Sequence, residues 1–131
     1  MFFMHACRKS VGDDFIVAFR FGACDYMEGG SEIKDISVAA RIFEQAGIDF
    51  LDISGGQCIY TIKGKTAPGW FAELSKPAKQ AVKVPVMLTG GVKTGEDAEK
   101  LLEGQAADLI GVGRSMMRDA EWTQKALAEV Q

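Results

Sequence analysis

The 131-residue chain is poor in the side chains that bind metals or form disulfides. It has three cysteines, Cys7, Cys24 and Cys58, and one histidine, His5. The cysteines are odd in number and none has C-x-x-C spacing, which argues against a disulfide framework and against a zinc site. We therefore expect no metal site, and we expect His5, ahead of the first predicted strand, to be a surface or packing residue.

The chain also lacks an excess of positive charge and long apolar segments. Its formal net charge is −3, so no basic stripe exists to neutralise the phosphates of a nucleic acid. Its longest apolar runs are far below the roughly 20 residues that span a membrane. Its apolar first residues have no basic segment ahead of them, unlike a secretory signal peptide. We expect a cytoplasmic protein that binds neither nucleic acid nor membrane.

What the chain does have is an alternation of apolar strand-like runs with segments of helical periodicity. The strands are predicted at 14–21, 48–54, 84–89 and 107–113. The helices are predicted at 33–47, 69–83, 94–104 and 120–130, with a short helical turn at 114–119. Pro77 lies inside the second helix, where we expect a break or a kink. Thr94 and Asp97 have the spacing of a capping box, and Gly47 and Gly104 are predicted to end helices.

Strands that alternate with helices predict an α/β fold with a parallel sheet. Four βα units correspond to half of a (β/α)8 TIM barrel, whose complete form takes about 250 residues. We treat residues 1–131 as a single half-barrel unit with no internal linker. Parallel strands this apolar are expected to be covered on both faces.

Glycine-rich segments follow the predicted strands, at the edge where function gathers in βα repeat folds. Gly90 and Gly91 follow the third strand, and Gly113 and Arg114 follow the fourth. Glycines admit an anion close to the backbone, helix N-termini direct N–H groups at it, and an arginine adds a charge-assisted bond. The pair of loops favours a phosphate site; the alternative is that these glycines only form left-handed turns.

Arg20 lies in a strand that is otherwise apolar. Burial of an arginine requires a partner, because an unpaired buried charge is costly. An intramolecular salt bridge, a position at the strand end that reaches solvent, and a role in ligand binding all remain open on the sequence alone.

These motifs carry a resemblance to a known family. The segments VGDDFIVAFRFGACDYMEGG, AGIDFLDISGG and VPVMLTGGVKTGEDAEKLLEGQAADLIGVGRSMMRDAEW are similar to the second half of the old yellow enzyme family, the FMN-dependent NADH:flavin oxidoreductases. The likeness extends from about residue 8 to about residue 125 and covers the last four βα units of the family's barrel. The strand-borne arginine, the SGG strand end, the GG loop and the GR loop occur in the family's order.

The resemblance implies FMN as the cofactor and NAD(P)H as the reductant, with hydride passed through the flavin to an activated alkene or similar small-molecule acceptor. It places Arg20 at the flavin ring, near N1 and the C2 carbonyl. Ser54 and Gly55 would lie beside the ring. The four residues expected to hold the FMN phosphate are Gly90, Gly91, Gly113 and Arg114.

The family's first four βα units and its usual substrate-anchoring residues have no counterpart here, so no catalytic residue is assigned, including Tyr26 and Tyr60. Four strands alone would expose two sheet edges and an apolar interior. We therefore expect a homo-oligomer or pairing with a complementary half-barrel. Two alternatives stay open: another phosphate-binding βα barrel enzyme, and a non-catalytic half-barrel that serves as an interaction module.

Overall fold

A computed structural model describes residues 2–57 and 61–131. In this part of the chain, four parallel strands form one sheet in the order β1-β2-β3-β4. The strands are β1 (Ala18–Gly22), β2 (Phe50–Ser54), β3 (Val86–Thr89) and β4 (Leu109–Gly111). Each neighbouring pair is parallel and in chain order, so the predicted α/β fold of consecutive βα units is confirmed.

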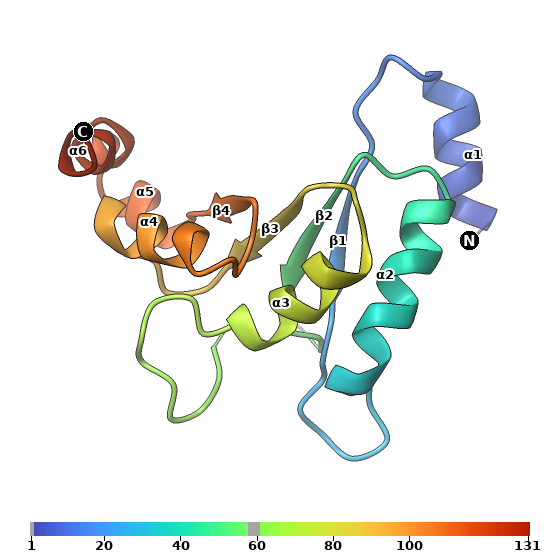
Figure 1. Cartoon of the computed structure of the whole chain (residues 1–131), viewed down its shortest axis with the longest axis horizontal. Helices are drawn as coiled ribbons and strands as arrows, with labels where there is room; N and C mark the ends of the chain where they lie inside the picture. The colour runs from blue at the N-terminus through green and yellow to red at the C-terminus, as the bar shows by residue number, and fades with distance from the viewer. Residues whose placement is uncertain (1, 58–60) are drawn as a thin grey trace.

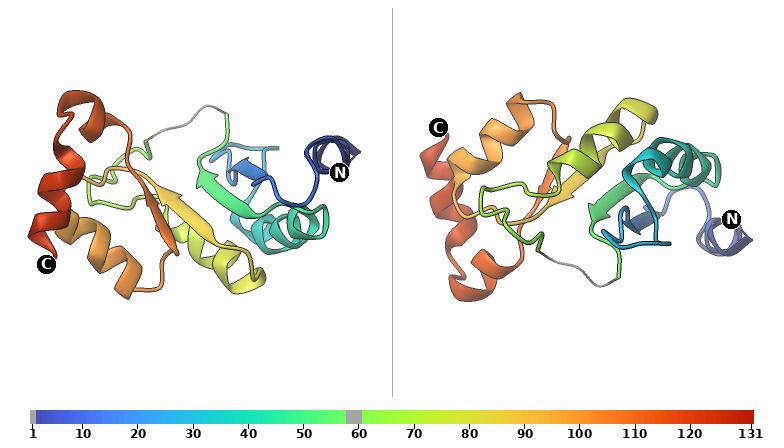
Figure 2. Two further views of the ribbon diagram at one scale, coloured as in Figure 1. Left: turned by 90° about the horizontal axis from the view of Figure 1, so that it is seen from above. Right: turned by 90° about the horizontal axis from the view of Figure 1, so that it is seen from below.

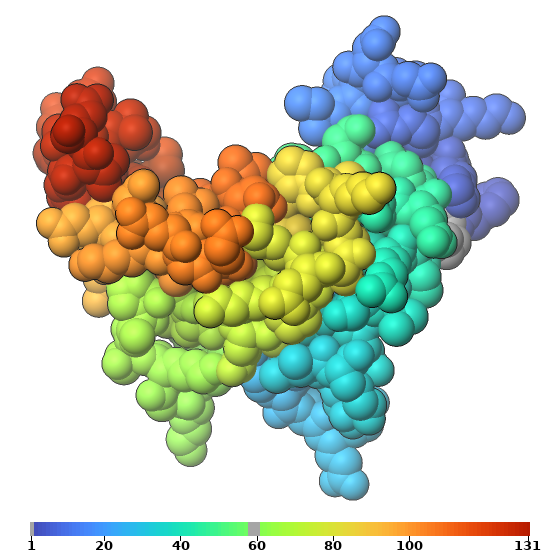
Figure 3. Space-filling view, in the orientation of Figure 1, coloured from blue at the N-terminus to red at the C-terminus, as the bar shows by residue number. Residues whose placement is uncertain are grey.

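Three helices, α2 (Ile36–Gln45), α3 (Ala72–Ala81) and α4 (Gly95–Glu103), lie along one face of the sheet (Figures 1 and 2). A 3-10 turn (Ile33–Asp35) precedes α2. Helix α1 (Phe2–Val11) lies at one end of the sheet, and α5 (Arg114–Arg118) and α6 (Trp122–Glu129) lie at the other. In the space-filling view α1 and α6 project from opposite ends, and α2, α3 and α4 form a continuous surface between them (Figure 3).

The core lies between the sheet and these three helices. Alternate residues of the two central strands point toward the helices and are fully buried, following the period-two geometry of a strand. On β2 and β3 these residues are Leu51, Ile53, Val86 and Leu88. Ile36 and Ala40 of α2 and Leu74 and Ala78 of α3 meet them, each with no exposed surface.

The opposite face of the sheet is not covered by helices of the described chain (Figure 2). In register, this face carries Arg20 of β1, Asp52 of β2, Met87 of β3 and Leu109 of β4. Leu109 keeps 44% of its surface exposed. One face is therefore left uncovered within this chain, as expected of four strands alone. In a full barrel this face is the interior, which the remaining strands enclose.

The two edge strands are shorter than predicted. Phe15 and Ile16, placed by the sequence in the first strand, are 63% and 70% exposed and lie before β1. β4 has three residues where seven were predicted. An edge strand has a hydrogen-bonding partner on one side only, so less of an apolar run is held in the extended ladder.

The helix ends follow the sequence signals closely. Thr94 Oγ1 accepts from Asp97 N at 3.1 Å and Asp97 Oδ2 accepts from Thr94 N at 3.3 Å, which confirms the capping box. Gly47 ends the α2 segment with φ +88°. α4 does end at Gly104, but the left-handed residue there is Gln105, with φ +53°.

Of the break or kink predicted at Pro77, the break is wrong. Helix α3 continues through Pro77 from Ala72 to Ala81. Proline removes one backbone hydrogen bond inside a helix, but this helix buries Leu74, Ser75 and Ala78 completely. Tertiary packing therefore holds the helix across the proline. Over the described residues, no helix combines the length and apolar character needed to cross a membrane.

Candidate functional site

A cavity of about 590 Å³ lies at the carboxyl ends of the strands. It is lined by most of the residues singled out from the sequence. These are Arg20, Ser54, Gly90, Gly91, Gly113 and Arg114. Gly55 does not line it; Gly55 is buried at the end of β2, and its carbonyl accepts a 3.3 Å hydrogen bond from Ser54 Oγ. Three loops that are distant in sequence thus meet at one site.

The cavity is strongly cationic although the chain is acidic overall. Five lining side chains carry positive charge: Arg20, Lys65, Lys93, Arg114 and Arg118. No aspartate or glutamate is among the described residues that line it. Low-dielectric walls of one sign concentrate the field within a cleft. The cavity therefore suits an anionic ligand, even in a chain with a net charge of −3.

Hydrogen bonds between the loops hold the rim in place. Gly69 N donates to Gly90 O at 2.6 Å, which ties the loop before α3 to the end of β3. Ser115 Oγ donates to Val92 O at 3.0 Å, so the first turn of α5 is tied to the loop before α4. Trp122 Nε1 of α6 donates to Lys93 O at 2.6 Å, which fixes the same loop from the other side.

Gly90 and Gly91 form a tight turn that packs against Trp70. Their φ angles are +121° and +71°, the region that favours glycine. A Cβ at Gly90 would stand 2.7 Å from the Trp70 ring, and one at Gly91 would stand 2.4 Å from it. The Arg114 guanidinium carbon lies 5.4 Å from the centre of the same ring, a cation–π contact. Both glycines are thus required by the turn and by the tryptophan.

Gly113 differs from these two glycines. Its φ is −108°, so it is not a left-handed turn residue. A Cβ built on Gly113 would meet no atom within 4 Å. Its backbone therefore lies open beside the cavity, and a ligand can approach it closely.

The N-terminus of α4 follows the Gly90-Gly91 loop, and N–H groups of its first turn are hydrogen-bonded within the chain. Glu129 of α6 accepts a hydrogen bond from Gly95 N at 2.6 Å. A Cβ at Gly95 would come within 2.1 Å of Ala126 O, so α6 is packed directly on this end. The N–H groups of Gly95 and Asp97 at this helix end are thus already hydrogen-bonded within the chain.

Arg20 both forms a salt bridge and lines the cavity. Arg20 Nη1 donates to Asp52 Oδ2 at 2.8 Å, and 61% of the arginine side chain is exposed against 11% of the aspartate side chain. Burial raises the pKa of Asp52 above its usual value, and the neighbouring Arg20 opposes that shift. The salt bridge considered for Arg20 is therefore present, and its role in ligand binding stays a prediction.

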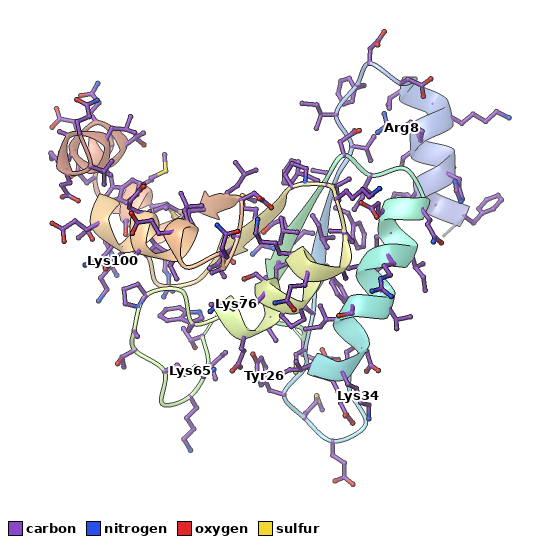
Figure 4. All side chains as sticks on the ribbon, in the orientation of Figure 1. Arg8, Tyr26, Lys34, Lys65, Lys76 and Lys100 are labelled. Atoms are coloured by element: carbon purple, nitrogen blue, oxygen red, sulfur yellow. The ribbon has the colours of Figure 1, made fainter. Side chains whose placement is uncertain are left out.

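A second polar cluster joins the loops that follow β1 and β2. Glu73 accepts a 2.9 Å hydrogen bond from Tyr26 Oη and an ion-paired hydrogen bond from Lys65 Nζ. Tyr26 and Lys65 are labelled on these two loops in Figure 4. Burial and the Glu73 carboxylate raise the pKa of Tyr26. A phenol held by a carboxylate in this way retains its proton, and Tyr26 does not line the cavity. The structure gives it no catalytic assignment.

The remaining residues considered from the sequence lie elsewhere. His5 is exposed on α1, as expected, and Cys24 is buried. Cys58 and Tyr60 lie outside the described residues.

Trp70 and Asp52 were not predicted from the sequence as residues of the site. Trp70 follows Pro68-Gly69, a loop signal at the same edge of the sheet as the other site residues. Asp52 precedes Ser54 by two positions, so strand alternation places both on one face. These two signals would have identified the residues.

A comparison with known families settles the relationship of the chain. The model of the NADH:flavin oxidoreductase / NADH oxidase family matches residues 3–131. The chain belongs to this family. The resemblance found in the sequence is thus confirmed, and the four parallel strands with their helices are a part of its TIM barrel.

The relatives are much longer proteins. The chain is 32% identical to an NADH oxidase of Thermoanaerobacter brockii over 91% of the chain and 19% of that protein. It is also 32% identical to a metal reductase of Desulforamulus reducens, over 94% of the chain and 19% of that protein. An NADPH dehydrogenase of Halalkalibacterium halodurans is 30% identical over 85% of the chain and 32% of that protein. The chain therefore spans a fifth to a third of the length of these relatives.

Proposed function

We propose that this chain is the flavin-binding half-barrel of an NAD(P)H-dependent oxidoreductase, with FMN as its cofactor. The observation that carries the proposal is the cationic cavity of about 590 Å³ at the strand ends. Its size is within the usual range of ligand pockets, roughly 300–1,000 Å³. Its donor set, with five cations and an open glycine, suits a phosphorylated ligand. Family membership supports FMN as that ligand.

Each group of residues has a role in this proposal. Arg114 and the backbone at Gly113 would hold the phosphate, the first through its guanidinium and the second by its open approach. Arg20 would face the ring system as a fixed positive charge, a preorganised form of electrostatic stabilisation. Ser54, at the end of β2, also lines the cavity. Bound FMN would supply hydride transfer from NAD(P)H to an acceptor such as an activated alkene.

The names of the relatives support a division of labour. An NADH oxidase, a metal reductase and an NADPH dehydrogenase all share the segment that this chain represents. What they share is better explained by a common cofactor than by a common acceptor. We infer that the acceptor is selected by residues outside this segment.

Assembly with a further barrel half, or with a second copy of this chain, is part of the proposal. β1 and β4 are the edges of the sheet, and Leu109 and Met87 lie on the uncovered face. Apolar side chains on an open parallel sheet favour association, since both edge and face otherwise contact water.

The test is reconstitution of the purified full chain with FMN. After desalting, the protein is expected to retain a flavin absorption spectrum, and titration should quench flavin or tryptophan fluorescence to saturation. Riboflavin, which lacks the phosphate, serves as the ligand control and should bind more weakly. A chain that stays colourless and gives no saturable quenching contradicts the proposal.

A further inference from the structure

Asp52 lies beside Arg20 in the sheet, on the face that carries the cavity. The β1–β2 register pairs the two residues directly. Their hydrogen-bonded ion pair joins a carboxylate that is almost wholly buried to a guanidinium that is mostly exposed. The aspartate is therefore the fixed partner, and the arginine is the one that extends to the wall of the cavity.

The surroundings of Asp52 do not suit a pair whose purpose is stability. Its Oδ1 atom is buried and has no hydrogen-bond partner among the described residues. Burial is the main influence on its pKa and raises it, so the attraction of Arg20 does not offset the loss of water. A buried ion pair of this kind is weak support for a fold. The role of the Asp52–Arg20 pair is therefore sought at the cavity, which Arg20 lines.

We propose that Asp52 is a positioning residue, which orients the Arg20 guanidinium at the cavity wall and reduces its effective charge toward a bound flavin. An unpaired arginine samples many rotamers, whereas a paired one presents its donors in one direction. This inference rests on the proposed function, because the flavin is the ligand toward which Arg20 is directed.

The direction of the effect follows from charge, because an asparagine oxygen at position 52 can still accept a hydrogen bond from Arg20 and so keeps part of its orientation. Two-electron reduction places negative charge on the flavin ring, which a nearby cation stabilises. Asp52→Asn removes the opposing charge and leaves the strand geometry intact. Reduced FMN should then bind about tenfold more tightly relative to oxidised FMN, a size typical of coupled neighbours. That ratio raises the two-electron midpoint potential by about 30 mV.

The experiment measures the midpoint potential of FMN bound to four full-length proteins: wild type, Asp52→Asn, Arg20→Ala and the double variant. The expected result is a rise in Asp52→Asn that disappears in the Arg20→Ala background. An unchanged or lower potential overturns the proposal. An equal shift in both backgrounds also overturns it, since Asp52 would then act without Arg20. Asp49→Asn is the matched control, because Asp49 pairs with Arg8 away from the cavity.

Thermal unfolding of the same proteins separates positioning from a structural role. Asp52→Asn is expected to unfold at or above the wild-type temperature, and Asp52→Ser replaces it if the amide does not fold. A lower unfolding temperature with an unchanged potential would show a merely structural bridge and overturn the proposal.

A measurement without flavin keeps the two proposals distinct. Nitrogen-15 NMR of the arginine side chains should show hindered rotation of the Arg20 guanidinium in the wild type and faster rotation in Asp52→Asn, where the charge-assisted bond becomes a weaker neutral one. A wild type that binds no FMN contradicts the proposed function, and this NMR comparison then decides the positioning role alone. Identical Arg20 signals in the two proteins overturn it.

Discussion

Replacement of Gly91 by alanine should destabilise the fold, whereas the same change at Gly113 should leave its stability almost unchanged. Gly91 has φ +71°, and an added Cβ would stand 2.4 Å from the Trp70 ring. A left-handed alanine costs about 1–2 kcal/mol, and overpacking adds about 1–3 kcal/mol. We therefore expect Gly91→Ala to lower the free energy of unfolding by roughly 2–4 kcal/mol, taking part of the overpacking as relaxed.

Gly113→Ala is the matched control, because it makes the same substitution at a glycine that has neither a left-handed backbone nor a close neighbour. Its φ is −108° and its added Cβ meets no atom within 4 Å, so the loss should stay below about 1 kcal/mol. The methyl group would instead occupy space beside the cavity and weaken FMN binding. Urea denaturation, followed by tryptophan fluorescence, gives both unfolding free energies. Equal stabilities for the two variants would refute the assignment of Gly91 to the Trp70 contact.

Three further outcomes are expected. Arg114→Ala should weaken FMN binding by about 10- to 100-fold, the contribution of a charge-assisted hydrogen bond, and leave riboflavin binding unchanged. An equal loss of affinity for both ligands would contradict the phosphate role of Arg114, and so would a similar loss in the exposed control variant Arg41→Ala. The Lys65 hydrogen bond holds the pKa of Glu73 below its usual value. The ionised Glu73 side chain therefore stabilises the fold above about pH 4.3, and this contribution is lost as the pH falls through the lowered pKa. Glu73→Gln should reduce the acid dependence of the unfolding free energy in urea titrations, and an unchanged dependence contradicts the assignment. Sedimentation of the isolated chain should show concentration-dependent association, whereas a constant monomer mass with cooperative unfolding would contradict the assembly proposal.

The features that the sequence predicted well are local ones. The capping box at Thr94 and the helix end at Gly47 depend on a few neighbouring residues, so their patterns are readable directly. The strand ends at Ser54 and Thr89 were placed correctly because hydrophobic runs and following glycines mark them. Parallel βα topology then brings such ends to one edge of the sheet.

The features that the sequence did not predict depend on contacts across the chain. Nothing near Gly90 and Gly91 indicates that Trp70, some twenty residues earlier, fills the space where a Cβ would stand. Helix α3 continues through Pro77 because of burial that periodicity alone does not measure. The capture of the α4 N-terminus by Glu129 joins residues 34 positions apart. Each is a tertiary effect that overrides a local rule.

The most direct test of the account is a comparison of FMN with riboflavin by nitrogen-15 amide NMR on the full chain. We expect both ligands to shift the signals of residues around Arg20, and only FMN to shift the backbone amides of Gly113 and Arg114. FMN-specific shifts that appear elsewhere, with Gly113 and Arg114 unmoved, would contradict the placement of the phosphate and with it the proposed flavin site.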